Sequence, residues 1–375
     1  MHYYISLTSK CNLNCKYCYG KSVDDFMSKD EEKMYDFEIP SDTIVKIEEL
    51  KKLSDGDDDF VITFYGGEPL LKIQTIKNIM DNVNAKKFMI QTNAIFLNKL
   101  DKKYVNKFDT IFASIDGNKE HTDERRGNGV YDKVIENLKK IRQNGFDGEI
   151  IARMTVDETC DIYKNVNHLI SNSDFNFSSI HWQIDAGFWK NDYISRNFLK
   201  WSLESYNTGI EMLVDEWINR IIKTREVLRI YPFVGIMHSL LTNEKALMRC
   251  GAGHKVLGIQ TDGKIVACPI TAGFKPLYMG DVKYSILKDI VKNKILPTGE
   301  CLTCEIKDIC GGRCLYSNKS KLWPESGRQQ ICNTIFFLVE KLKSKVDIIK
   351  DEIKKGNISY DDFYYPKYNG CEIIP

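Results

Sequence analysis

Six short apolar segments, rich in β-branched residues, recur through the first half of the chain, and amphipathic segments separate them. The apolar segments are residues 2–8, 59–65, 86–92, 110–116, 149–156 and 178–185. Each has the length and composition of a buried strand. Helical periodicity follows in residues 41–53, where we expect Ser41 or Asp42 to cap a helix, and in residues 131–145, where Gly145 should end one. This alternation predicts an α/β fold of parallel strands joined by right-handed crossovers.

The pattern changes twice further along the chain. Residues 186–247 become helical and aromatic, which favours helices packed against the sheet. Most of the cysteines lie from residue 250 onward. Within this part, the sequence IQTDGKIVAC predicts a β-hairpin that turns at Asp262-Gly263.

The overall composition narrows the class of protein. Hydrophobic residues make up 43% and charged residues 28% of 375 residues, and the net charge is +1. This balance gives no sign of a nucleic-acid partner or a membrane surface. Neither an apolar run of transmembrane length nor a signal-peptide core is present in the sequence, so we expect a cytoplasmic protein. Twelve cysteines in such a protein indicate metal binding rather than disulfides.

Three of these cysteines lie close together near the N-terminus. Cys11, Cys15 and Cys18 have the spacing C-x3-C-x2-C, with no fourth cysteine or histidine nearby. Three thiolates on a 4Fe-4S cluster leave one iron without a protein ligand, and that iron can bind a small molecule. A zinc site completed by a distant ligand, or three buried thiols, are the alternatives.

The aromatic Tyr17 directly before the third cysteine gives a run that resembles the radical S-adenosylmethionine (radical SAM) superfamily. The resemblance implies that SAM chelates the open iron and that one electron from the cluster releases a 5′-deoxyadenosyl radical, which abstracts a substrate hydrogen. It also implies a partial (β/α)6 TIM-like barrel, with reactive groups at the carboxyl ends of the strands.

The expected strand ends carry residues that match this family. The second strand is followed by Gly-Gly-Glu-Pro, which contacts the SAM amino group in the resembled family, and the fourth by Ser-x-Asp-Gly, which lies near its ribose and carboxylate. Either Arg126 or Arg153 would pair with the SAM carboxylate. Together with Tyr17, the cofactor-binding candidates are Gly66, Gly67, Glu68, Pro69, Gln91, Asn93, Ser114, Asp116, Arg126 and Arg153.

The second cysteine group resembles the SPASM domain, the auxiliary-cluster module of peptide- and protein-modifying radical SAM enzymes. The resemblance implies an outer set of cluster ligands, Cys301, Cys304, Cys310 and Cys332, and an inner set, Cys250, Cys268 and Cys314. The inner cluster has either an open iron or Cys371 as its fourth ligand. The implied cofactors are SAM and three 4Fe-4S clusters. Cys160 is expected to be buried packing.

These observations divide the chain into four parts. We expect a radical SAM partial barrel at residues 1–190, bridging helices at 191–249, a SPASM domain at 250–335, and a C-terminal helix and tail at 336–375.

The resemblance implies an enzyme that installs a crosslink or an oxidation in a ribosomally made peptide or protein, with a ferredoxin or flavodoxin as reductant. Only ten residues precede the first cysteine, so we expect substrate recognition through the barrel surface or a separate leader-binding protein. The alternatives are a sulfatase maturase that forms formylglycine, an enzyme of a small metabolite, or a non-catalytic zinc-binding module. Sulfatase maturases carry an aspartate base where this chain has Pro269.

The catalytic acid or base is sought on the sixth strand. His181, Gln183 and Asp185 share one face by the period of two, and we take His181 and Asp185 as candidates if that face points into the barrel. Tyr65 and Asp116 are further candidates.

Overall fold

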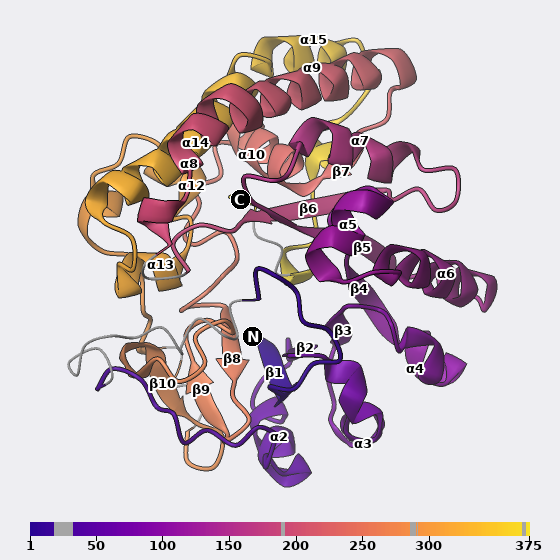
Figure 1. Ribbon diagram of the computed structural model, residues 1–375, viewed down its shortest axis with the longest axis vertical. Coiled ribbons are helices and arrows are strands. Elements are labelled where there is room, and N and C mark those ends of the chain that lie inside the picture. The colour runs from indigo at the N-terminus through magenta and orange to yellow at the C-terminus, as the bar shows by residue number, and fades with distance from the viewer. Residues whose placement is uncertain (19–32, 189–191, 286–289, 291, 370–372) are drawn as a thin grey trace.

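One curved sheet forms the centre of the molecule (Figure 1). The computed structural model describes residues 1–375 except 19–32, 189–191, 286–289, 291 and 370–372. Within the described residues ten strands lie in the order β10-β9-β8-β1-β2-β3-β4-β5-β6-β7. Their bounds are β1 His2–Thr8, β2 Val61–Gly66, β3 Lys87–Thr92, β4 Phe108–Ser114, β5 Glu149–Val156, β6 Ser179–Ile184, β7 Arg229–Ile230, β8 Val256–Ile259, β9 Lys264–Val266 and β10 Tyr278–Asp281. The six expected strands are β1 to β6, and all neighbours from β8 through β1 to β7 pair in parallel.

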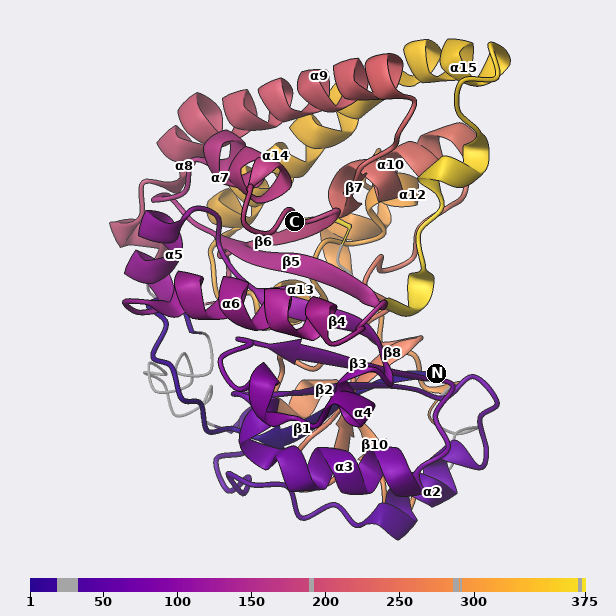
Figure 2. The same ribbon diagram turned by 90° about the vertical axis from the view of Figure 1, so that its right-hand side faces the viewer.

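Helices cover the outer face of this sheet (Figures 1 and 2). In the first half they are α2 Ile47–Ser54, α3 Ile73–Asn82, α4 Lys102–Val105, α5 Lys119–Arg126, α6 Val130–Gln143 and α7 Ile162–Ser171. The helices of the second half of the chain are α8 Phe198–Trp201, α9 Asn207–Thr224, α10 Tyr231–Thr242, α12 Lys307–Cys310, α13 Leu315–Ser320, α14 Glu325–Lys343 and α15 Val346–Lys354, and not all of them lie on the outer face. A π-helical segment, Ser202–Tyr206, joins α8 to α9. None of the helices in the described ranges is long and apolar enough to cross a bilayer.

The two faces of the sheet differ in chemistry. Register pairs Ser114 with Arg153, and Arg153 with His181, so these side chains share one face. We call this the lumen face. The opposite face carries buried apolar residues such as Ile62 and Met154, which pack under the helices in the main core. The alternation of side chains along each strand thus separates an apolar face from a partly polar lumen.

One predicted helix begins later than its sequence suggested. Neither Ser41 nor Asp42 caps a helix, because α2 begins only at Ile47. The Asp42 carboxylate accepts a hydrogen bond from the Thr8 hydroxyl at 2.7 Å and pairs with Lys10 at 3.1 Å. Asp42 therefore binds partners that are distant in sequence instead of capping a helix. The end of α6 is as predicted, since Gly145 follows it with a positive φ of 88°.

The cysteine-rich part of the chain continues the barrel sheet. β8 pairs in parallel with β1, and β8 and β9 form the expected hairpin, in which Gly263 has a φ of 94°. This arrangement brings the residues around Cys268 beside the strand that leads into the first cysteine motif. In Figure 1, α12 and α13 lie across the sheet from α4 and α6.

Candidate functional site

The segment of residues 9–18, called here the cysteine loop, follows β1 at the carboxyl edge of the sheet. The Gly67 amide donates to the Thr8 carbonyl at 2.8 Å. A side chain at Gly66 would place its Cβ 2.2 Å from the Thr8 carbonyl oxygen, and one at Gly67 would come within 2.3 Å of the Lys10 carbonyl oxygen. Glycine is required at both positions because the end of β2 presses directly against the cysteine loop.

Glu68 holds three strand ends together. Its amide donates to the Lys10 carbonyl at 2.9 Å. Its carboxylate, which is fully buried, accepts hydrogen bonds from the Leu70 amide at 2.9 Å, the Thr92 hydroxyl at 2.7 Å and the Asn93 amide at 2.8 Å. Burial raises the pKa of Glu68 to about 7, although these three donors oppose the shift. The Glu68 carboxylate thus joins the ends of β2 and β3 to the cysteine loop, and Pro69 begins the short 3-10 helix after it.

Asn93 extends the same support to the first cysteine. Its amide nitrogen donates to the Asn12 side chain at 2.9 Å and lies 3.8 Å from the Cys11 sulfur. Gln91, two residues earlier, is half-buried on β3. Sequence reasoning missed Asn12, because an asparagine inside a cysteine motif carries no signal of its own.

Asp116 anchors the other side of the cysteine loop. It accepts four hydrogen bonds: from the Tyr17 hydroxyl at 2.6 Å, from Arg126 Nε and Nη2 at 2.8 Å each, and from the Thr155 amide at 2.9 Å. Both Asp116 and Arg126 are buried. The Arg126 guanidinium also lies 5.4 Å from the centre of the Tyr17 ring. With four bonds accepted, the Asp116 carboxylate serves as an anchor between β4, β5 and the cysteine loop.

Arg153 occupies the middle of the lumen face. It is half-buried, its in-register neighbour Ser114 is half-buried, and its guanidinium lies 3.1 Å from His181 Nδ1. His181 is fully buried, and Gln183 is half-buried two residues further along β6. His181 therefore lies on the same face of the sheet as Arg153.

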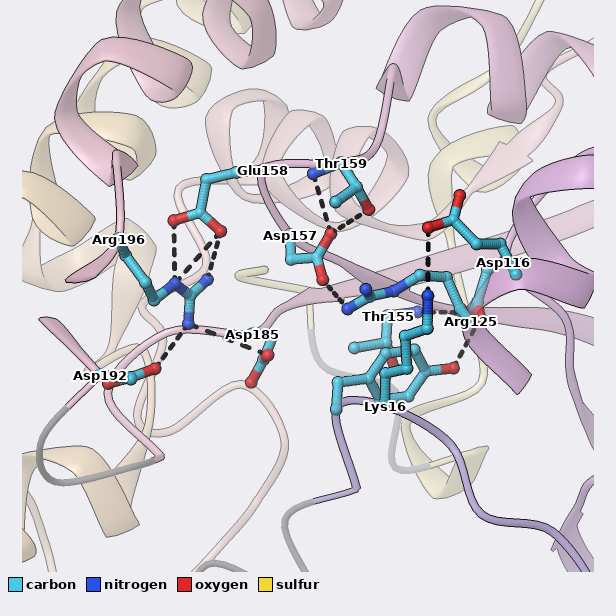
Figure 3. A network of polar contacts seen from close by, with 12 residues as sticks. Lys16, Asp116, Arg125, Thr155, Asp157, Glu158, Thr159, Asp185, Asp192 and Arg196 are labelled. Atoms are coloured by element: carbon cyan, nitrogen blue, oxygen red, sulfur yellow. Dashed lines mark hydrogen bonds and ion pairs between the residues drawn. The ribbon is translucent and has the colours of Figure 1, made fainter. Parts of the chain in front are cut away.

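Asp185 lies just beyond the end of β6 within a network of charged groups (Figure 3). It is buried, and its carboxylate lies 3.9 Å from the Arg196 guanidinium. Arg196 is already engaged by Glu158 at 2.7 Å and by Asp192 at 2.9 Å. Burial raises the pKa of Asp185 to about 6, while Arg196 lowers it. Asp185 is thus a carboxylate whose proton affinity suits exchange near neutral pH.

The outer cysteine set lines one concave pocket, formed between α12 and α14. Its wall contains Cys301, Cys304, Cys310 and Cys332 together with Arg313. The pKa of Cys310 is raised to about 12, chiefly by burial, and the charges of Cys332, Cys301 and Cys304 act in the same direction. Cys301 and Cys332 are 31 residues apart in sequence. Even so, the four thiols lie close enough for the charges of three to act on Cys310.

Although Cys314 also lines the pocket of the outer set, the inner cysteine set packs in a second apolar cluster. Cys250, Cys268 and Cys314 pack there with Met248 and Tyr316. Cys371, the alternative fourth ligand, lies outside the described residues. Cys160 is buried, as expected for packing, and the Asn165 side-chain amide donates to its sulfur at 3.6 Å.

The thiols fit the clusters that the sequence implies. Among the residues that the structure describes, no three His, Cys, Asp or Glu side chains converge tightly enough to hold a single metal ion. In the cysteine loop the charges of Cys15 and Cys18 act on Cys11, so these three sulfurs also lie near one another. Groups composed of thiols alone are the donor sets that iron–sulfur clusters take.

Comparison with known proteins identifies a family that the first part of the chain matches. Residues 5–159 match the Radical SAM superfamily. The radical SAM cyclopropyl synthase TigE of Paramaledivibacter caminithermalis is 23% identical over 338 residues, 84% of this chain and 68% of that protein. A cysteine-type anaerobic sulfatase-maturating enzyme of Clostridium perfringens is 22% identical over 342 residues, 84% of this chain and 88% of that protein.

Solved structures share the fold. Native anSMEcpe with bound AdoMet superposes with a TM-score of 0.71 at 18% identity, covering 93% of this chain and 99% of that one. Streptococcus suis SuiB bound to its precursor peptide SuiA gives 0.54 at 17% identity, covering 85% and 72%. These likenesses confirm the α/β partial barrel. The family match identifies residues 5–159 of this chain as a radical SAM domain.

Proposed function

We propose that the protein cleaves SAM reductively and uses the resulting radical to modify a ribosomally made peptide or protein. One observation supports this most strongly: the chain next to Cys268, in the second cysteine group, packs against the lumen face. The cysteine loop stands at the carboxyl edge of the sheet, and Ile270, two residues after Cys268, packs against Tyr4 and Tyr65 on the lumen face. A substrate in the lumen would contact both regions.

Cys11, Cys15 and Cys18 would hold the SAM-binding cluster, which when bound supplies one electron for the cleavage of SAM. We assign the SAM carboxylate to Arg153 rather than to Arg126. Arg126 already forms a two-pronged bond with buried Asp116, whereas Arg153 is half-buried on the lumen face. Ser114 and Gln91 on neighbouring strands, and the backbone at Gly66–Gly67, complete the proposed cofactor site.

The outer and inner sets would hold two auxiliary 4Fe-4S clusters. The proximity of the four outer thiols supports the first. The apolar surroundings of Cys250, Cys268 and Cys314 support the second, because burial excludes water from a cluster and tunes its potential. A ferredoxin or flavodoxin is the proposed reductant.

Asp185 is the proposed proton acceptor for the substrate. It stands at the carboxyl edge of the sheet, where the proposed substrate would lie, and its raised pKa of about 6 gives it affinity for a proton while leaving it ionised at neutral pH. His181 lies deeper on β6, fully buried beside Arg153, and would orient that guanidinium.

The names of the relatives support a peptide substrate. SuiB is bound to a precursor peptide, and anSMEcpe has been solved with the Cp18Cys peptide. Between crosslinking and formylglycine formation we favour crosslinking. Pro269 occupies the position of the sulfatase-maturase base, and its Cα lies 2.9 Å from where a Cβ of Gly258 would stand, on the strand beside β1.

Anaerobic reconstitution with iron and sulfide tests the proposal. We expect about twelve irons per chain, four for each of three clusters, and release of 5′-deoxyadenosine when SAM and dithionite are added. Two or three zinc ions and a colourless protein would instead support the zinc-binding alternative. A peptide encoded by a small neighbouring reading frame should lose two mass units on crosslinking, one for each hydrogen removed.

A further inference from the structure

The segment of residues 184–188, called here the Asp185 segment, lies against the cysteine-rich part of the chain. Arg313 supplies the main link. Its Nη2 donates to the Ile184 carbonyl at 2.8 Å and its Nη1 to the Ala186 carbonyl at 3.4 Å. The Arg313 guanidinium therefore binds the backbone on both sides of Asp185. Its Nε donates to the Pro375 carbonyl at 2.6 Å.

Close packing adds to these bonds. Gly187 has a φ of 80°, and a Cβ there would come within 2.8 Å of the Ser317 hydroxyl. The Phe188 ring stacks on Tyr316 with the ring centres 6.4 Å apart and an interplanar angle of 6°. The Arg313 guanidinium lies 5.9 Å from the centre of the Phe188 ring. The Asp185 segment therefore fits a surface formed by residues 313–317.

The same arginine belongs to the wall of the outer cysteine pocket. Arg313 lines it with the outer set, and its chain neighbour Cys314 belongs to the inner set. A change in the positions of these cysteines would move the Arg313 backbone and, with it, the three donors. One side chain thus connects both cysteine sets to the backbone that carries Asp185.

We propose that Arg313 is a positioning residue that makes the placement of Asp185 depend on an assembled cysteine module. The inference rests on the proposed function, in which Asp185 accepts the proton and the cysteines hold clusters. An enzyme with empty auxiliary sites would then have an unsupported proton acceptor, so radical formation would not proceed to product.

Arg328 provides a matched control. It lines the same pocket and, like Arg313, its charge acts on Cys332. Its described contacts go elsewhere: Nη1 donates to the Trp323 carbonyl at 3.0 Å and Nε lies 3.4 Å from Glu300. Loss of either arginine removes a positive charge near the outer cysteines, but only the loss of Arg313 releases the Asp185 segment.

Hydrogen exchange, followed by mass spectrometry on the reconstituted protein, tests the link. Two amides report on the segment: Asp185 donates to the Val156 carbonyl at 2.8 Å and Ala186 to the Ile184 carbonyl at 3.0 Å. In Arg313→Met we expect them to exchange about tenfold faster than in the wild type. Arg328→Met should exchange at the wild-type rate. Wild-type exchange in Arg313→Met with full iron content, or equal acceleration in both variants, would overturn the inference.

A second variant approaches the link from the cysteine side and serves if Arg313→Met does not fold. Cys301→Ala removes one outer thiol, which the described contacts do not place against the Asp185 segment. We expect the same two amides to exchange faster in it; unchanged exchange together with a lost outer cluster would contradict the coupling. Failure of the proposed function would look different, because the wild-type protein itself would then lack iron–sulfur absorption or release no 5′-deoxyadenosine.

Discussion

The two cysteine regions of this molecule are built in opposite ways. The cysteine loop holds three thiols within eight residues, and side chains from the ends of β3 and β4 support it, chiefly Asn93 and Asp116. The second group spans 83 residues, and its thiols come together only through the packing of helices and a hairpin. A local motif fixes the first site, whereas tertiary folding fixes the second.

This difference indicates which substitutions should disrupt each site. The cysteine loop depends on polar contacts to strand ends, so single hydrogen-bonding side chains should control it. The second group depends on buried surfaces and on the helices that bring its thiols together. Substitutions that discriminate between these two modes of support are therefore the most informative.

The largest effect should come from Cys15→Ala compared with Cys301→Ala. Loss of a cysteine-loop thiol should abolish 5′-deoxyadenosine release, by about a thousandfold or more, because the cofactor site itself is lost. Loss of an outer thiol should lower the iron content and leave this release detectable. Cys160→Ala, which alters a buried thiol outside both groups, is the control and should keep all of its iron. Equal loss of release in Cys15→Ala and Cys301→Ala would remove the distinction between the two sites.

The next largest effect should be on stability. Arg126→Met leaves the buried Asp116 carboxylate without its charged partner, and we expect the free energy of unfolding to fall by about 3–5 kcal/mol in urea titrations. The cysteine loop should loosen as well, because Tyr17 shares that carboxylate. A loss below about 1 kcal/mol would show that Asp116 does not anchor the loop. Arg328→Met, in the second region, should cost much less because its Glu300 partner is exposed.

A smaller effect, with a distinct pH dependence, should follow from Asp185→Asn. Because burial raises the pKa of Asp185 from 3.8 to about 6, the folded protein binds this proton more tightly than the unfolded chain does. The wild-type protein therefore loses stability as the pH rises from about 4 to about 6, and the penalty remains above that range. Asparagine cannot ionise, so Asp185→Asn removes this loss of stability. The free energy of unfolding of the variant should exceed that of the wild type by about 2–3 kcal/mol at pH 8 and nearly equal it at pH 4.

Thermal unfolding of both proteins at the two pH values measures this difference. A variant less stable than wild type at pH 8 would show that the Arg196 charge, not burial, dominates at Asp185. Product formation by the wild type should also rise with pH through about 6, since the proposed proton acceptor must be ionised.

The smallest effect should come from Tyr17→Phe. The change removes one hydrogen bond to a charged acceptor and keeps the ring, so we expect a loss of about 1.5–3 kcal/mol in unfolding free energy, toward the lower value because Asp116 keeps three donors. Iron in the cysteine loop, measured after mild chelation, should fall while the other iron stays. Uniform loss from all clusters would mean that Tyr17 acts on the whole fold rather than on this loop.

Much of the fold followed from the sequence, because strand and helix periodicity is local. β1 to β6 and the hairpin at Gly263 were predicted for this reason. Asp42 shows the limit of this local reasoning. An aspartate can cap a helix, but here its carboxylate binds Thr8 and Lys10 at the end of β1 instead.

The site residues show the same limit. Glu68 and Asp116 were identified as ligand contacts, and the structure shows both carboxylates buried, each accepting three or four hydrogen bonds from the protein. Sequence spacing brings such residues to one edge but cannot say whether they face a ligand or each other. Arg313 was missed altogether, since its partners at Ile184 and Ala186 are more than a hundred residues away.

The pairing of β1 with β8 has a consequence for how this protein can be divided. β1 has neighbours on both sides, β2 and β8, so the strand that leads into the cysteine loop is an interior strand. A fragment that ended before residue 250 would expose the side of β1 that pairs with β8 at His2–Ile5 as an open edge, and open edges promote aggregation. We therefore expect that attempts to produce the barrel alone will yield insoluble material.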